Sequence, residues 1–273
     1  MNTLSTYSIN LGGKLVELAE PQVMGILNVT PDSFFAGSRR QTEEAIRERA
    51  RQILDEGASM IDVGACSTRP GAQLATEEEE RERLAMGLAA IRRELPDAVV
   101  SLDTFRASIA EWAVGEYGVT IVNDVTGGED PDMFPMVARL GVPYVLTYPG
   151  GVAQGMGEVM HDLSRRIDAL LELGQKDILL DPGYGFGKTL DENYQLLAHQ
   201  SELKQMGLPL LVGVSRKSMV FRLLGIGPED ALNGTTVLHT LALLGGANIL
   251  RVHDVAKAVE VIKIVKQCSC HSA

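Results

Sequence analysis

Polar side chains able to do chemistry recur along the chain, each within or directly after a short apolar run. They are Asn28, Asp62, Asp103, Asn123, Asp124, Thr147, Asp181, the run Ser215-Arg216-Lys217 and the run Arg251-Val252-His253. Asp103, Asn123 and Asp181 offer oxygen acceptors and one amide donor. This set suits a flat heterocycle rich in N–H groups.

Basic residues form the other half of the pattern. Arg69, Lys217, Arg251 and His253 lie near the ends of apolar runs in a chain whose formal net charge is −11. A guanidinium group binds phosphate oxygens through two parallel hydrogen bonds. The pattern predicts a local basic pocket for a small anion, and the overall negative charge argues against nucleic acid as a partner.

The elements that must carry these residues are short strands, because most of the apolar runs have the length and continuity of strands covered on both faces. The eight runs are residues 23–28, 60–64, 99–103, 121–123, 144–147, 178–181, 210–214 and 249–252. The helical segments expected between and after them are residues 42–55, 76–95, 106–116, 131–140, 158–173, 190–200, 229–244 and 254–266. Eight strands with intervening helices over about 250 residues predict an α/β fold, a single (β/α)8 TIM barrel.

In such a barrel the carboxyl ends of all strands meet at one face, where active sites lie. A single polar residue after a strand is often only the N-cap of the next helix. Carboxylates, amides and cations mixed over eight strand ends favour an active site over a bare scaffold.

Local signals mark individual segments. Thr76 with Glu79 predicts a capping box that opens one helix, and Gly57 predicts the end of the helix before it. The barrel is expected over residues 21–267. Residues 1–20 form an N-terminal extension, expected to be a hairpin that closes the barrel bottom, and residues 268–273 form a tail expected to be disordered.

Composition excludes several other classes of protein. A chain of 273 residues with 45% hydrophobic residues can bury a sizeable core. No apolar run approaches the ~18–20 residues that span a bilayer, so no membrane is expected as a partner. The three cysteines form no disulfide framework. These features predict a soluble cytoplasmic protein.

Seven ordered motifs make the chain resemble the dihydropteroate synthases, the folate-pathway family that sulfonamides inhibit. The motifs are residues 24–34, 61–64 with 67–71, 101–105, 122–124, 181–188, 213–217 and 251–254. The resemblance implies a transferase that condenses 6-hydroxymethyl-7,8-dihydropterin diphosphate with p-aminobenzoate, giving 7,8-dihydropteroate and pyrophosphate. It also implies Mg²⁺ on the diphosphate and a homodimer.

The resemblance assigns roles to individual residues of this chain. The pterin site would be Asp103, Asn123, Asp181 and Lys217. The diphosphate site would be Asn28, Arg69, Arg251 and His253, with Asn28 as the Mg²⁺ ligand. The p-aminobenzoate site would be Thr68, Pro70, Phe186 and Ser215. Catalysis is expected of Asp103, Asp181, Lys217 and Arg251, because a cation-like pterin methylene needs negative charge near the ring and positive charge on the leaving group.

Three segments depart from the family pattern. Ala36 stands where the first loop usually has a carboxylate, and Cys66 stands in a pair, Ala65-Cys66, that replaces the usual Gly-Glu. The segment Thr147-Tyr148-Pro149-Gly150 replaces the usual Met-His-Met segment that contacts the pterin. The departures leave two alternatives open, a methyltransferase-type pterin-binding barrel and a catalytically inactive barrel. Asn28, Arg251 and His253 favour the synthase.

Overall fold

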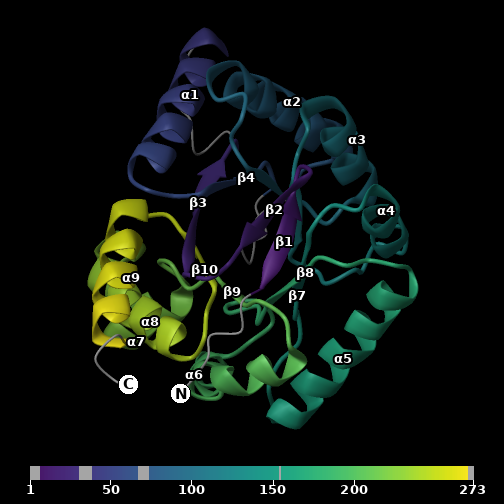
Figure 1. Ribbon diagram of the computed structural model, residues 1–273. Helices are drawn as coiled ribbons and strands as arrows, with labels where there is room; N and C mark the ends of the chain where they lie inside the picture. Colours follow the sequence, from purple (N-terminus) through teal and green to yellow (C-terminus); the bar gives the residue numbers. More distant parts are fainter. Residues whose placement is uncertain (1–6, 31–38, 67–73, 154, 270–273) are drawn as a thin grey trace.

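Eight parallel strands surrounded by helices form the body of the protein (Figure 1). The computed structural model describes residues 7–30, 39–66, 74–153 and 155–269. The inner strands are β3 (Gln22–Asn28), β4 (Met60–Gly64), β5 (Val100–Asp103), β6 (Ile121–Asp124), β7 (Tyr144–Thr147), β8 (Ile178–Asp181), β9 (Leu211–Val212) and β10 (Ile249–Val252). All eight fall on the predicted apolar runs, with ends that differ by two residues at most.

The sheet curls into a nearly closed barrel. Its strand order is β8-β7-β6-β5-β4-β3-β10-β9, and a parallel bridge between Leu180 and Leu210 links β8 to β9. Because every neighbouring pair is parallel, the carboxyl ends of all strands lie at one end of the barrel. This confirms the predicted (β/α)8 fold.

The described helices follow the predicted segments with one addition. They are α1 (Arg39–Asp55), α2 (Glu77–Glu94), α3 (Ala107–Tyr117), α4 (Met133–Leu140), α5 (Met156–Glu172), α6 (Leu190–Ala198), α7 (Ser218–Leu224), α8 (Leu232–Leu244) and α9 (Val255–Ser269), with 3-10 turns η1 (Gln200–Met206) and η2 (Pro228–Asp230). Helix α7 was not predicted, because seven residues are too few to show a helical period. The helix expected from residue 229 begins at Leu232, after Pro228 has opened η2.

The local signals for two helix ends are confirmed. The Thr76 hydroxyl accepts from the backbone N–H of Glu79 at 3.2 Å, and the Glu79 carboxylate accepts from the N–H of Thr76 at 2.9 Å. Gly57 has a φ of +102°, a left-handed conformation that only glycine adopts cheaply. The two hydrogen bonds fix the start of α2, and the backbone conformation of Gly57 lets the chain turn away after α1.

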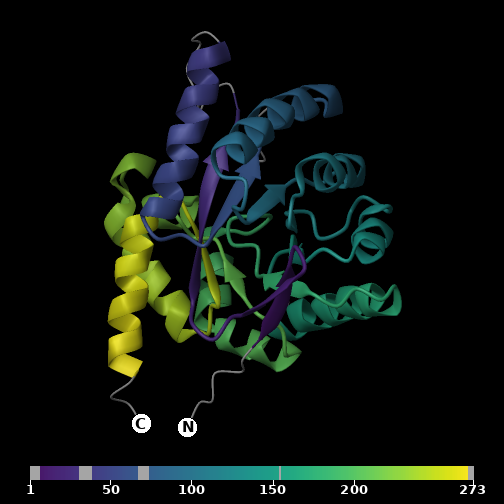
Figure 2. The same ribbon diagram turned by 45° about the horizontal axis from the view of Figure 1, so that its top comes forward.

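A hairpin lies across the end of the barrel where the strands begin (Figure 2). Strands β1 (Ser8–Leu11) and β2 (Lys14–Glu17) pair antiparallel. Ile9, Leu11 and Leu18 are buried there in one apolar cluster with inward-facing residues of the barrel. The hairpin thus adds three apolar side chains to the packing at this end of the barrel.

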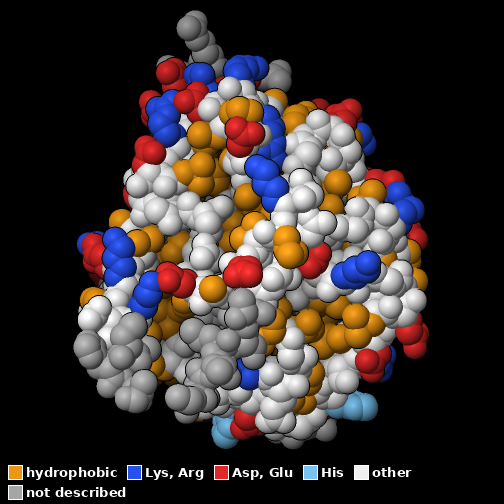
Figure 3. Space-filling model, viewed as in Figure 1, with side chains coloured by type: hydrophobic (Ala, Val, Ile, Leu, Met, Phe, Trp, Pro, Cys, Tyr) orange, Lys and Arg blue, Asp and Glu red, His pale blue; other side chains and the backbone are white. Residues whose placement is uncertain are grey.

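The helices cover the outside of the barrel, and a second, larger apolar cluster lies between the two layers. Among the described residues, no helix is long and apolar enough to cross a membrane. On the face seen in Figure 3, the coloured Lys and Arg side chains alternate with Asp and Glu side chains instead of forming one basic patch.

Candidate active site

The inside of the barrel is built in two layers of side chains. The layer nearest the hairpin, here called the hairpin-end layer, is apolar: Met24, Met60, Val99, Ile121, Val145, Leu179, Leu211 and Ile249. Side chains of a strand point alternately to opposite faces, so the residue two positions later faces the interior again. This second layer, here called the mouth layer, is Ile26, Asp62, Ser101, Asn123, Thr147, Asp181, Gly213 and Arg251.

Arg251 crosses the mouth layer and joins two acidic groups. Its Nε donates to Asp62 and its Nη2 donates to Asp103, which lies one step further toward the open end. Burial opposes the charge of Arg251, but the Asp62 and Asp103 carboxylates together raise its pKa. Burial raises the pKa of Asp103 to about 7, although the adjacent Arg251 charge counteracts part of that rise. A mixed-charge cluster therefore occupies the centre of the mouth.

Several buried polar atoms of the mouth layer have no hydrogen-bond partner among the described residues. They are Asp62 Oδ1, Ser101 Oγ, Asn123 Oδ1 and Thr147 Oγ1. Asn123 Nδ2, in contrast, donates to Asp62 Oδ2 at 3.1 Å, which turns the amide oxygen of Asn123 away from that carboxylate. An unsatisfied buried polar group costs roughly 1–3 kcal/mol. Four in one layer indicate a surface built for a polar ligand.

Asp181 and Lys217 lie on the β8 and β9 side of the mouth. Asp181 Oδ1 accepts from the backbone N–H of Gly183 at 2.7 Å, and burial raises the pKa of the carboxyl group. Lys217 Nζ donates to the carbonyl of Tyr184 and lies 4.4 Å from the centre of the Phe186 ring. Burial lowers the pKa of Lys217 to about 8. The predicted pterin residue Lys217 and the predicted amine-site residue Phe186 are thus in direct contact.

Ser215 and His253 form a second contact pair at the ends of β9 and β10. The Ser215 hydroxyl oxygen accepts from the backbone N–H of His253 at 3.1 Å and lies 3.2 Å from His253 Nδ1. Arg49 of α1 donates to the His253 carbonyl at 2.7 Å. The imidazole is thereby held beside the open end of the barrel.

Asn28 ends β3 beside Gly64, the last residue of β4. A Cβ placed on Gly64 would lie 3.6 Å from Asn28 Oδ1 and 3.6 Å from Asp103 Oδ2. The missing side chain at Gly64 therefore leaves the Asn28 amide and the Asp103 carboxylate on either side of one small space. Of the residues that the structure describes, no three His, Cys, Asp or Glu gather as a metal site.

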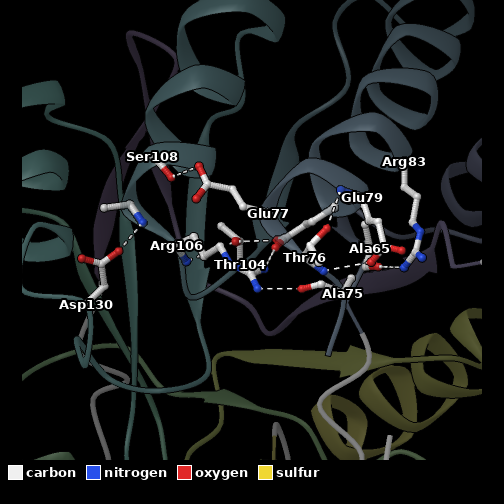
Figure 4. Close-up of polar contacts among 12 residues, drawn as sticks. Ala65, Ala75, Thr76, Glu77, Glu79, Arg83, Thr104, Arg106, Ser108 and Asp130 are labelled. Carbon is white, nitrogen blue, oxygen red and sulfur yellow. Dashed lines mark hydrogen bonds and ion pairs between the residues drawn. The ribbon is translucent and has the colours of Figure 1, made fainter. Parts of the chain in front are cut away.

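The predicted residues Thr68, Arg69 and Pro70, and also Ala36, lie outside the described residues. The chain on both sides of residues 67–73 is held by arginines (Figure 4). Arg83 of α2 donates to the carbonyl of Ala65 at 3.2 Å, and Arg106 donates to the carbonyl of Ala75 at 2.7 Å.

A buried carboxylate holds Arg106 in turn. Glu80 of α2 is fully buried and forms an ion pair with Arg106. Its other oxygen accepts from the hydroxyl of Thr104 at 2.7 Å. Since Thr104 directly follows Asp103, this network also fixes the backbone beside that carboxylate.

The sequence-predicted residues that the structure describes do gather at one end of the barrel. Sequence reasoning named Asp62 and Thr147 among the polar strand-end residues without giving either a binding role, and it did not name Ser101. All three are buried in the mouth layer. A count of two residues from Val99 would have placed Ser101 there. Asp124 faces the other way, where it accepts from the Tyr144 hydroxyl and the backbone N–H groups of Thr126 and Gly128 at 2.8 Å.

Comparison with known proteins agrees with this geometry. Residues 24–253 match a family model described as pterin binding enzyme. The chain is 36% identical over 270 residues to the dihydropteroate synthase of Escherichia coli strain K12, which covers 93% of this chain and 94% of that protein.

Solved structures are equally similar. Xanthomonas albilineans dihydropteroate synthase with 4-aminobenzoic acid has a TM-score of 0.89 and 37% identity, covering 98% of this chain and 100% of that one. Yersinia pestis dihydropteroate synthase in a sulfonamide drug complex has a TM-score of 0.88 and 36% identity, covering 97% of this chain and 100% of that one.

Proposed function

This chain belongs to the dihydropteroate synthase family of pterin-binding enzymes, and we propose that its barrel mouth joins a pterin diphosphate to p-aminobenzoate. The amine nitrogen attacks the methylene of 6-hydroxymethyl-7,8-dihydropterin diphosphate, and the bond from that carbon to the diphosphate oxygen breaks. The products are 7,8-dihydropteroate, pyrophosphate and the proton that the amine loses.

The observation that carries the proposal is the set of unpartnered atoms in the mouth layer. Asn123 Oδ1 and Asp62 Oδ1 are acceptors, while the hydroxyls of Ser101 and Thr147 can donate or accept. A pterin ring offers N–H donors along one edge and ring nitrogen and carbonyl acceptors elsewhere. Such a ring satisfies this layer, whereas an apolar ligand would leave each group unpaired.

The proposed binding roles keep to the residues predicted from sequence. Asp103, Asn123, Asp181 and Lys217 bind the pterin. Arg251 and His253, with Arg69, bind the diphosphate, while Phe186 and Ser215, with Thr68 and Pro70, bind p-aminobenzoate. Arg251 suits the diphosphate because its Nη1 group makes no hydrogen bond to any described residue, while Nε and Nη2 hold it in place.

Electrostatic stabilisation accounts for the rate in this proposal. Positive charge develops on the pterin methylene as the diphosphate leaves, and the Asp103 and Asp181 carboxylates lie beside the ring to stabilise it. Arg251 and His253 stabilise the negative charge on the departing diphosphate. The arylamine is already unprotonated at neutral pH, so the mechanism needs no strong base and no serine or cysteine nucleophile.

Mg²⁺ is proposed to enter with the diphosphate and not as a resident metal. The donor chemistry fits: Asn28 offers one hard amide oxygen beside the Gly64 gap, and Mg²⁺ commonly takes few protein ligands, with phosphate oxygens and water completing its shell. When bound, the ion neutralises charge on the leaving group. Asn28 then orients the diphosphate end of the substrate.

A homodimer is proposed through the outer face of α7 and α8. Several large apolar side chains are exposed there: Leu223, Leu224, Ile226, Val237, Leu241 and Leu244. Val237, Leu241 and Leu244 recur every three or four residues and so share one face of α8. An exposed apolar face of this kind indicates an interaction surface. A second copy is the simplest partner, because a two-fold axis pairs one patch with itself.

A cytoplasmic location is also proposed. Among the residues described, no pair of cysteines forms a disulfide. Cysteines outside disulfides are typical of proteins in a reducing compartment.

Pyrophosphate release by the purified protein tests the function. We expect release that requires the pterin diphosphate, turns over when p-aminobenzoate is added, and stops in EDTA. Binding of pteroic acid without any pyrophosphate release would identify a catalytically inactive pterin-binding barrel instead. A protein that neither binds pteroic acid nor releases pyrophosphate would contradict the proposed function.

A further inference from the structure

The loop between β8 and α6 carries a lysine that none of the proposed binding roles uses. Lys188 Nζ donates three hydrogen bonds, to the carbonyls of Gly183 at 2.8 Å, Phe186 at 3.1 Å and Tyr148 at 3.1 Å. An ammonium group has three donors, so all of them are used. Two of the carbonyls belong to the loop of Lys188 itself, and the third belongs to the loop after β7.

The surroundings of Lys188 are unusual for a lysine. Its donors go to carbonyl oxygens and not to a carboxylate, and its Nζ lies 5.0 Å from the centre of the Tyr148 ring. Burial lowers its pKa to about 8, while the nearby Asp181 charge favours the protonated form. Since burying a lysine is unfavourable, a lysine held in this way indicates a specific task.

The loops after β7 and β8 contact each other, and the β8 loop contacts the side chains of the mouth. Phe186 presents its ring to Lys217 Nζ, and Gly183 donates its N–H to Asp181. Close approach of the loops depends on glycine: a Cβ on Gly183 would lie 2.0 Å from the Tyr148 carbonyl oxygen. The two loops therefore meet backbone to backbone. Lys188 bridges them beside Gly183, and Glu192 at the start of α6 bridges them further out, accepting from the N–H groups of Val152 at 2.9 Å and Thr189 at 2.7 Å.

We propose that Lys188 is a positioning residue for the p-aminobenzoate subsite, acting by holding the loops after β7 and β8 so that Phe186 lies against Lys217. The inference rests on the proposed function, because it assigns Phe186 to the amine substrate. Lys188 itself need not touch either substrate. The backbone contact with Tyr148 also explains how a chain without the usual Met-His-Met segment keeps this side of the mouth in place.

The test compares Lys188→Met with Lys176→Met. The first substitution removes the ammonium and keeps the aliphatic stem, while Lys176 is exposed before the opposite end of β8 and serves as the matched control. We expect Lys188→Met to raise KM for p-aminobenzoate about 10-fold or more and to change KM for the pterin diphosphate far less, since misplacement of a binding group by about 1 Å can cost 100-fold. Lys176→Met should change neither.

A double-mutant cycle separates positioning from general stability. If Lys188 acts through Phe186, then Lys188→Met adds little to KM for p-aminobenzoate in a Phe186→Ala background. Lys188→Gln, which keeps two N–H donors, should have an intermediate effect and provides the same test if the Met variant does not fold. Additive effects in the cycle, or equal changes in KM for both substrates, overturn the inference.

The wild-type protein distinguishes failure of the inference from failure of the proposed function. A wild type that neither releases pyrophosphate nor binds pteroic acid in calorimetry contradicts the proposed function, and the inference falls with it. A wild type that does both, alongside a Lys188→Met variant with unchanged KM for p-aminobenzoate, contradicts the inference alone.

Discussion

The two ends of the barrel interior use the same eight strands for opposite purposes. At the hairpin end each strand contributes an apolar side chain, and with Ile9, Leu11 and Leu18 these form one closed cluster. Two residues further along, the same strands contribute the acids, amide, hydroxyls and arginine of the mouth layer. Two residues along each strand therefore separate the layer that stabilises the fold from the layer that is proposed to bind the substrate.

The mouth layer is expected to lower the stability of the fold. The hairpin-end side chains are apolar and need only apolar contacts. In the mouth layer, a buried polar atom has no partner among the residues described in each of Asp62, Ser101, Asn123 and Thr147. Active sites commonly sacrifice stability in this way.

Asp103→Asn should have the largest effect. The substitution keeps the shape of the side chain but removes its negative charge from beside the pterin. We expect kcat/KM for the pterin diphosphate to fall at least about 100-fold, as when one preorganised electrostatic partner is lost. The melting temperature should change little. A variant with wild-type kcat/KM would remove Asp103 from the mechanism.

Leu179→Ala should show the reverse behaviour. Leu179 is fully buried in the hairpin-end layer, two residues before Asp181 on the same strand. The cavity should lower the free energy of unfolding by about 2–5 kcal/mol, measured by urea denaturation. KM for both substrates should stay within a factor of about three at 25 °C, if the two layers are independent to the extent usual for separated sites. Large KM changes in a folded variant would contradict the separation of the two layers.

The pH dependence of kcat/KM should be set by two titrating groups of the barrel mouth, Asp103 and Lys217. Burial raises the pKa of Asp103 to about 7 and lowers the pKa of Lys217 to about 8. Both groups act in their charged forms, so kcat/KM for the pterin diphosphate should rise as pH increases through about 7 and fall above about 8. Each limb should approach a tenfold change per pH unit. Leu179→Ala should keep this profile, and a flat profile from pH 6 to 9 would contradict the assignment.

Thr147→Val should give the smallest effect and the most specific one. Thr147 Oγ1 is buried and has no partner in the described part of the chain, and valine has nearly the same shape. We expect the ligand-free protein to become more stable by about 1 kcal/mol, while pteroic acid binds more weakly in calorimetry. A loss of stability would show that the hydroxyl is satisfied in the free protein.

Much of this arrangement could be predicted from the sequence, because strand ends in a parallel barrel converge. The positions of Asp103, Asn123, Asp181 and Arg251 after apolar runs were enough to place them at one site. The ion pairs of Arg251 with Asp62 and Asp103 could not be predicted, since they connect strands far apart in the sequence across the barrel interior.

The unpredicted features share one physical origin. Continuous apolar runs conceal which residues face inward, so Ser101 looked like an ordinary strand residue, and Thr147 was named at a strand end without a binding role. Lys188 looked like the end of a glycine-rich motif, and only the approach of the β7 loop reveals its three carbonyl partners. Contacts between separate loops depend on the closed barrel and leave no local pattern in the chain.

A crystal structure of the protein with pteroic acid bound tests the pterin site most directly. We expect the pterin ring inside the barrel mouth, hydrogen-bonded to Asp103, Asn123 and Asp181, with the benzoate end near Phe186. A pterin ring bound outside the mouth layer, with the Asn123 and Thr147 oxygens still unpaired, would show that the mouth layer is not the pterin site.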